Sequence, residues 1–145
     1  ATTCFCEDKE HAVRVVGQVL GEARSLVSAS LRERLLVVSR TGNSDEGLDL
    51  DIGFALTKES QRSIKLPGGL ELTPRELPAE DEMATVVRTG PPWRSHFAFG
   101  AIGTWIENNG YELKGPCREV FLDPPFFDGA SEPVIEIQFP VRRAV

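Results

Sequence analysis

The sequence TGPPWRSHFAFGAIGTWIENNGYELKGPCREVFL, residues 89–122, decides the fold of this chain. It predicts a turn, a helix over residues 95–108 that Gly110 ends, and an apolar strand over residues 116–122. Glu119 interrupts that strand between apolar neighbours. A carboxylate in apolar surroundings is costly unless it is paired, protonated or available to a cation. Glu119 is therefore the leading candidate for a functional residue.

The segments on both sides of this stretch extend the pattern. Residues 83–89 form a β-type run that a glycine and two prolines end. Residues 134–141 alternate between apolar and polar side chains, as a strand with one buried face does. The second half of the chain is therefore predicted to run strand, helix, strand, strand.

The first half begins with a predicted helix. Apolar residues recur at helical spacing as far as Leu31, and Asp8 is a candidate N-cap, so we expect a helix that continues through Arg32. An alternative reads residues 12–16 as a strand, because they alternate and are β-branched, with the helix beginning after it. Residues 2–6 fit either a short strand or a disordered lead-in.

Two strands and a connector complete the first half. Residues 35–39 form a β-type run, and residues 48–56 alternate with the period of a half-buried strand. Residues 58–69 are polar and end in Pro-Gly-Gly, which predicts a connector. Residues 70–77 read as a further strand.

An internal repeat relates the two halves. DIGFAL at residues 51–56 matches the pattern of EIQFPV at residues 136–141, and each closes a helix–strand–strand run. We therefore predict one α+β domain over residues 1–145, built from duplicated β-α-β-β modules with a cleft between them. The modules would span about residues 1–57 and 70–145.

Composition and charge narrow the class of function. A chain of 145 residues fits one domain with a real core. Its net charge of −6 and pI near 5.0 disfavour direct contact with nucleic acid, because phosphate binding needs a basic surface. No window approaches ~20 apolar residues and no signal-peptide pattern opens the chain, so we expect a cytoplasmic protein without membrane contact.

The three cysteines predict neither a disulfide framework nor a metal site. Cys4 and Cys6 stand near the start and Cys117 far along the chain, with no second cysteine pair to complete a zinc set. His11 could supply a third ligand, but a frayed terminus is the preferred interpretation of this spacing. No metal and no cofactor is therefore predicted.

Four motifs give the chain a resemblance to a known family: Thr89-Gly-Pro-Pro, Trp105-Ile-Glu-Asn-Asn-Gly-Tyr111, Arg118-Glu-Val-Phe-Leu122 and Glu136-Ile-Gln-Phe-Pro-Val141. Over about residues 67–142 the chain resembles the GyrI-like effector-binding domain, the ligand-binding half of multidrug-sensing MerR- and AraC-type transcription regulators. The resemblance implies an antiparallel sheet and two helices with pseudo-twofold symmetry around a central ligand cavity. It also implies an acidic residue that neutralises lipophilic cations and aromatic rings that stack on them.

The resemblance assigns the acidic role to Glu119. The aromatic residue of the family's Gly-Pro-Tyr turn is absent, because Pro92 stands there with Trp93 next. The expected ligand-binding aromatic residues are Trp93, Trp105, Phe97, Tyr111 and Phe121, and Phe99 is a further possible wall. An alternative places Glu119 on a solvent face or pairs it with Arg118 or Lys114. Alternation places Glu136 on the face of its strand opposite to Ile135, Ile137 and Phe139, and we expect structural roles for Glu136 and its counterpart Asp51.

The preferred function is a regulatory or drug-sequestering module that binds lipophilic, cationic or aromatic small molecules. No helix-turn-helix is evident in the sequence, so a DNA-binding domain or protein partner would lie outside this chain. One alternative is a hydrolase of strained electrophilic molecules, in which cavity acids activate water. Another is a protein-interaction module that acts through its acidic surface. No catalytic residue is assigned.

Overall fold

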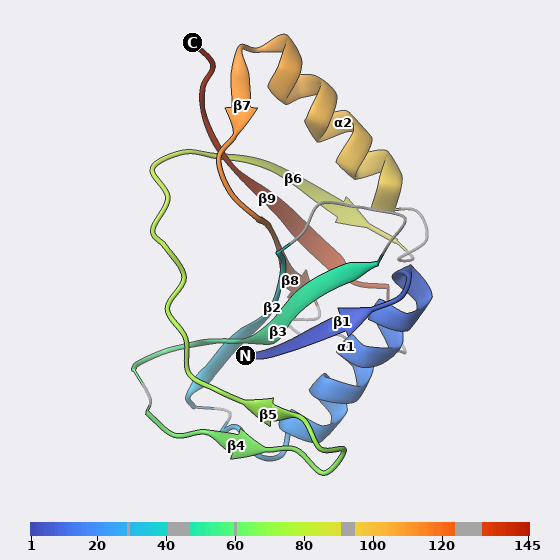
Figure 1. Ribbon diagram of the computed structural model, residues 1–145, viewed down its shortest axis with the longest axis vertical. Coiled ribbons are helices and arrows are strands. Elements are labelled where there is room, and N and C mark those ends of the chain that lie inside the picture. The colour runs from blue at the N-terminus through green and yellow to red at the C-terminus, as the bar shows by residue number, and fades with distance from the viewer. Residues whose placement is uncertain (29, 41–46, 60, 91–94, 124–131) are drawn as a thin grey trace.

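The computed structural model describes residues 1–28, 30–40, 47–59, 61–90, 95–123 and 132–145. The fold is α+β, with two helices on one face of a strongly twisted antiparallel sheet (Figure 1). In chain order the elements are β1 (Thr2–Cys6), α1 (Lys9–Ala23), β2 (Arg32–Ser39), β3 (Leu48–Leu56), β4 (Ile64–Lys65), β5 (Glu71–Leu72), β6 (Met83–Thr89), α2 (Ser95–Asn108), β7 (Tyr111–Leu113), β8 (Cys117–Asp123) and β9 (Val134–Arg143).

The sheet joins the two halves of the chain edge to edge. Its strand order is β1-β3-β2-β8-β9-β6, and β7 pairs with the end of β9. All of these pairings are antiparallel. The β2–β8 pairing is the seam between the halves, so the strand that carries Glu119 lies at the centre of the sheet.

Helix α1 begins where the sequence predicts and ends earlier. The Asp8 side chain accepts a hydrogen bond of 2.8 Å from the backbone N–H of His11, as an N-cap does. The helix ends at Ala23, not at Arg32. The serine-containing segment that follows forms turns, which suits serine because its hydroxyl competes for backbone groups. Arg32 instead starts β2 and pairs with Leu56.

The strands predicted over residues 48–56 and 83–89 and the helix over residues 95–108 are confirmed with those bounds. Gly110 follows α2 with a φ of 75°, a conformation in the left-handed region that glycine adopts without steric cost. The short strand β7 comes next and was not predicted. Its three residues pair with the end of β9, where Leu113 lies opposite Val141. This pairing prolongs the sheet beneath α2.

The strand predicted over residues 70–77 is mostly absent. Only Glu71–Leu72 is extended and paired, with Ile64–Lys65 as its partner in a separate two-stranded sheet. Pro74 and Pro78 explain the difference, because proline cannot donate to a strand ladder. The rest of the segment crosses the face of the sheet that carries no helix (Figure 1).

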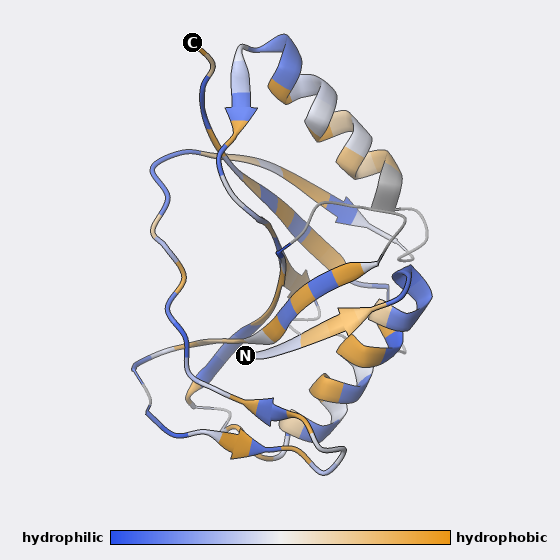
Figure 2. Ribbon diagram, viewed as in Figure 1, coloured by the Kyte–Doolittle hydropathy of each residue, from blue (hydrophilic) through white to orange (hydrophobic). Residues whose placement is uncertain are grey.

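The main core lies between the sheet and α1. Figure 2 shows the alternation of hydrophobic and hydrophilic residues along β3 and β9. One face presents buried residues such as Leu35, Ile52 and Ile137, and both helices cover this face. A smaller cluster under α2 contains Ala84, Ile102, Ile106 and Val141. Neither described helix is long and apolar enough to cross a membrane.

Candidate functional site

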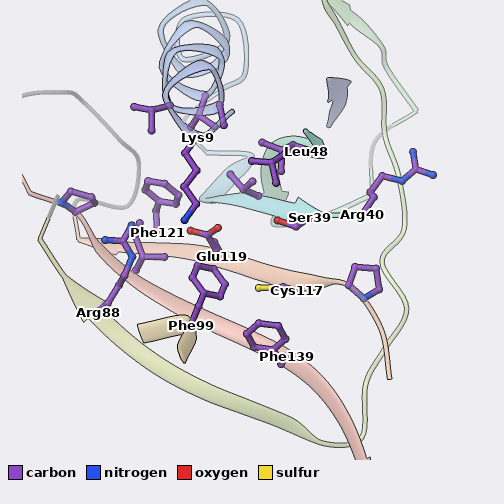
Figure 3. A pocket seen from close by; sticks show the side chains of 18 of the residues that line it. Lys9, Ser39, Arg40, Leu48, Arg88, Phe99, Cys117, Glu119, Phe121 and Phe139 are labelled. Atoms are coloured by element: carbon purple, nitrogen blue, oxygen red, sulfur yellow. The ribbon is translucent and has the colours of Figure 1, made fainter. Parts of the chain in front are cut away.

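A cavity of about 400 Å³ lies between the helix-covered face of the sheet and the two helices (Figure 3). Strands β2, β3, β8 and β9 form its floor, and the first turns of α1 and α2 contribute to its walls. The lining residues are Lys9, Ala12, Val13, Val16, Val37, Ser39, Arg40, Leu48, Leu50, Arg88, Phe99, Leu113, Gly115, Pro116, Cys117, Glu119, Phe121, Pro133, Ile135 and Phe139.

Glu119 reaches this cavity because of its register in the sheet. It lies opposite Val37 of β2 and Ile137 of β9, both of which are buried on the helix-covered face. Side chains directly opposite on paired strands point to the same face. The half-buried Glu119 side chain therefore projects from the cavity floor (Figure 3).

The alternative ion pairs for Glu119 do not form. Arg118, the preceding residue, points to the opposite face and donates a hydrogen bond of 2.7 Å to the carbonyl of Pro78. Its guanidinium lies 4.0 Å from Glu80, and Lys114 lies 3.1 Å from the same carboxylate. Glu80 thus pairs with both Arg118 and Lys114, the two cations that could have paired with Glu119.

The surroundings of Glu119 act on its carboxyl in opposite directions. Burial raises the pKa of Glu119 above its ordinary value, because an apolar medium disfavours the charged form. Arg88 and Lys9 lower the same pKa through their positive charges. Burial also lowers the pKa of Arg88, and Glu119 opposes that effect. Glu119 is therefore an acid whose pKa is raised by burial and lowered by two basic residues that line the same cavity.

Three phenylalanines provide the aromatic lining. Phe121 lies on β8 two residues after Glu119, so both side chains face the cavity. Phe99 of α2 and Phe139 of β9 pack edge to face, with ring centroids 5.9 Å apart and an interplanar angle of 88°. Phe139 was not predicted as a site residue, and Phe99 was expected only as a further possible wall. Alternation in β9 could have identified Phe139, because it shares a face with the buried Ile137.

Three of the aromatic residues expected at the cavity lie elsewhere. Trp105 is 49% exposed and stacks on Tyr111, with ring centroids 5.8 Å apart, beyond the cavity wall. Phe97 is 64% exposed. The reason is the orientation of α2, which presents Ile102 and Ile106 to the sheet and leaves Trp105 and Phe97 off that stripe. Trp93 lies outside the described residues.

The lysine and arginine at the cavity were also missed by the sequence analysis. Lys9 and Arg88 come from the start of α1 and the end of β6, which are far apart in the sequence. No spacing rule connects such positions. Only the packing of α1 on the sheet, together with the pairing of β6 with β9 in that sheet, brings them to the same cavity.

The cysteines form no metal site within the described ranges, where no cluster of three or more potential ligands occurs. Cys4, Cys6 and Cys117 are free thiols. His11 instead accepts a hydrogen bond of 3.0 Å from the backbone N–H of Glu7 through Nδ1. Burial, assisted by Glu119, raises the pKa of the Cys117 thiol to about 12, so this cavity residue is protonated at neutral pH.

A second hollow of about 600 Å³ lies on the other face of β2 and β3, beneath the segment that follows β3. Its walls include Asp51 and Arg75, whose side chains pair at 2.8 Å. Asp51 also accepts a hydrogen bond of 2.6 Å from Thr3. Glu136 lies on the same outer face and accepts a hydrogen bond of 2.7 Å from Gln138. Asp51 and Glu136 therefore have local partners.

Comparison with known proteins identifies solved structures that share the fold. No protein-family model and no curated protein matches the chain. The crystal structure of the EcmrR C-terminal domain matches with a TM-score of 0.69 and 18% identity, over 99% of this chain and 89% of that one. The cryo-EM structure of the EcmrR–DNA complex in EcmrR-RPo matches with a TM-score of 0.69 and 19% identity, and the chain spans about half (53%) of that longer chain. The chain thus has the fold of the EcmrR C-terminal domain, which supports the resemblance to GyrI-like domains.

Proposed function

We propose that this domain binds lipophilic, aromatic small molecules in the Glu119 cavity and that Glu119 receives a cationic group of the ligand. The observation that carries the proposal is a carboxylate on the floor of a cavity of about 400 Å³ with three phenylalanine walls. A volume of this order suits a drug-sized molecule, and few polar groups in an apolar lining are typical of ligand sites.

The role of Glu119 follows from electrostatics in a medium of low dielectric constant. Burial raises its pKa, so the ionised form is costly until a positive group approaches. A lipophilic cation brings that charge, and the edges and faces of Phe99, Phe121 and Phe139 can contact its aromatic body. Cation–π attraction would add about 0.5–2 kcal/mol for a well-placed ring.

The regulatory part of the proposal rests on the fold. EcmrR is found bound to DNA, and the matched region covers about half of that chain. By analogy, this domain would report the presence of a ligand to a DNA-binding domain or protein partner outside the chain, or would sequester the ligand. A hydrolase in the same cavity has less support, since Glu119 is the sole carboxylate among its described lining residues and Tyr111 lies elsewhere.

We also propose that the two halves are copies of one module. The orders β1-α1-β2-β3 and β6-α2-β8-β9 correspond element by element, and the sheet order places corresponding strands at matching positions on either side of the β2–β8 seam. The similar DIGFAL and EIQFPV sequences lie on β3 and β9. A crystal structure whose halves superpose only by a rotation far from a half-turn would contradict this.

The binding proposal is tested with 9-aminoacridine, a small fluorescent aromatic cation, followed by the anisotropy of its own emission. Emission from Trp105 is a poor signal here, because this residue stacks on Tyr111 and does not line the cavity. Glu119→Gln keeps the shape of the side chain and removes its charge. We expect affinity to fall about tenfold or more, which corresponds to about 1.4 kcal/mol.

The matched control is Glu136→Gln, the same change on the opposite face of the neighbouring strand. It should leave the affinity for 9-aminoacridine unchanged. Circular dichroism should show that both variants remain folded. Equal affinity of the wild type and a folded Glu119→Gln variant would overturn the role given to Glu119.

A further inference from the structure

The charged residues at the cavity suit a ligand that carries an acidic group as well as a cationic group. Among the described lining residues, Lys9, Arg40 and Arg88 are basic and Glu119 alone is acidic. This balance opposes that of the whole chain, whose net charge is −6. Arg40 is exposed and its guanidinium points away from the cavity (Figure 3). Lys9 and Arg88 remain, so an ionised Glu119 still leaves the lining with an excess of positive charge.

Lys9 stands at the mouth of this cavity. It is the first residue of α1, it is exposed to solvent, and its side chain extends toward Glu119 (Figure 3). Within the described ranges it forms no direct ion pair. Its acidic neighbours Asp8 and Glu10 are exposed and do not line the cavity, and Asp8 is engaged as the N-cap through His11. The Lys9 ammonium is thus a positive charge beside Glu119 that a ligand can reach from solvent.

Arg88 adds a second positive charge on the inner side. It is buried at the end of β6 and donates a hydrogen bond of 3.2 Å to the carbonyl of Gly90. Its charge acts on Glu119 more strongly than that of Lys9 does. A cation that approaches Glu119 therefore comes near two like charges, which weakens the attraction that Glu119 provides.

We propose that the ligand class of this cavity is amphoteric: an aromatic body with a cationic group that reaches Glu119 and an acidic group, such as a carboxylate, that reaches Lys9. This inference rests on the proposed function and narrows its ligand class. The acidic group turns Lys9 from a competing charge into a partner. Because Lys9 is exposed, the acid at the mouth keeps part of its hydration and avoids most of the cost of burying an ion pair.

Two acridines test this with a single chemical difference. 9-Aminoacridine is a cation, and 9-aminoacridine-2-carboxylic acid has the same ring with an added carboxylate. We expect the zwitterion to bind about tenfold more tightly to the wild-type domain, as for one added charge-assisted contact of about 1.4 kcal/mol. In Lys9→Gln this preference should shrink to about twofold or less, by loss of that contact.

The matched control is Lys65→Gln, which removes the same charge from an exposed lysine outside the cavity. It should keep the wild-type preference for the zwitterion. Glu119→Gln should weaken the binding of both acridines, because both carry the cationic group.

Three outcomes overturn the inference while leaving the proposed function in place. The plain cation could bind as tightly as the zwitterion, the preference could survive in Lys9→Gln, or anthracene-2-carboxylate, which lacks the cationic group, could bind as tightly as the zwitterion. Failure of both acridines to show saturable binding would instead overturn the proposed function, and this inference with it.

Discussion

The acidic residues on the two faces of the sheet differ in their interaction partners. On the outer face, Asp51 contacts Arg75 at 2.8 Å and Thr3 at 2.6 Å, and Glu136 contacts Gln138 at 2.7 Å. On the helix-covered face, Glu119 lies among Val37, Ile137 and phenylalanine rings, and the bases that influence it stand across an open cavity. The outer acids have partners on the same strand, on an adjacent strand or on the crossing segment.

This difference separates structural acids from a candidate binding acid. A carboxylate with hydrogen-bond partners close by is stabilised by the folded protein itself. A carboxylate that faces an apolar cavity is stabilised by a ligand that enters the cavity. The comparison also explains why the same alternating strand pattern gives two outcomes. Glu136 and Glu119 lie on neighbouring strands but on opposite faces, one register step apart.

The largest effect that tests this comparison concerns packing. Ile137 is fully buried beside Glu119, whereas Val87, on the strand next to β9, is 54% exposed on the outer face. Ile137→Ala should reduce the free energy of unfolding by about 2–5 kcal/mol, because it removes buried methylene and methyl groups and leaves a void. Val87→Ala should cost less than about 0.5 kcal/mol.

Urea denaturation would measure both losses of unfolding free energy. The slope of unfolding free energy against urea concentration should be the same for all proteins. Similar losses at the two positions would show that the helix-covered face is no more tightly packed than the outer one, and the contrast between the faces would then fail.

The next effect is the pH dependence that Glu119 gives to stability. Burial raises its folded pKa above the ordinary value of 4.5, so between the two values the folded chain keeps a proton that the unfolded chain has lost. The stability due to this group is therefore greatest below pH 4.5 and falls as pH rises through the folded pKa. Each unit of separation is worth about 1.4 kcal/mol.

Glu119→Gln removes this titration. Its stability relative to the wild type should increase as pH rises across that interval. Urea denaturation of the wild type and of this variant at a series of pH values measures the change. A Glu119→Gln difference that stays constant with pH would show that this carboxyl titrates alike in the folded and unfolded chain.

The smallest expected effect comes from the outer face. The Asp51–Arg75 pair is partly exposed, with 39% of the Arg75 side chain accessible. Asp51→Asn should therefore cost less than about 1 kcal/mol of stability, because water and salt screen such pairs. Binding of 9-aminoacridine should not change, since Asp51 and the cavity lie on opposite faces. A loss of affinity comparable to that of Glu119→Gln would remove the distinction between the faces.

Periodicity predicted much of the architecture. The strands over residues 48–56 and 83–89 and the helix over 95–108 match their predicted bounds, because alternation and helical spacing are local signals. The errors have local causes as well. Helix α1 stops at Ala23 because the serine-containing segment after it forms turns, and the strand over 70–77 is limited by Pro74 and Pro78.

The site was predicted less completely than the fold. Alternation and the motif pointed to Glu119 and Phe121, and both line the cavity. Helical spacing could not say how α2 is rotated against the sheet, so Trp105 and Phe97 were expected at a wall that Phe99 forms. Neither residue type nor spacing indicates that rotation, which depends on how Ile102 and Ile106 pack on Ala84 and Val141.

The sequence by itself determined which residues could share a face, because the periods of strand and helix are properties of the local backbone. It placed Glu119 and Glu136 each on a strand that alternates and has one apolar face. Only the tertiary structure decided which face received the helices and which charges met there. Lys9, Arg88 and Glu119 come from three separate elements, and their proximity depends on long-range strand pairing and helix packing, which no local pattern encodes.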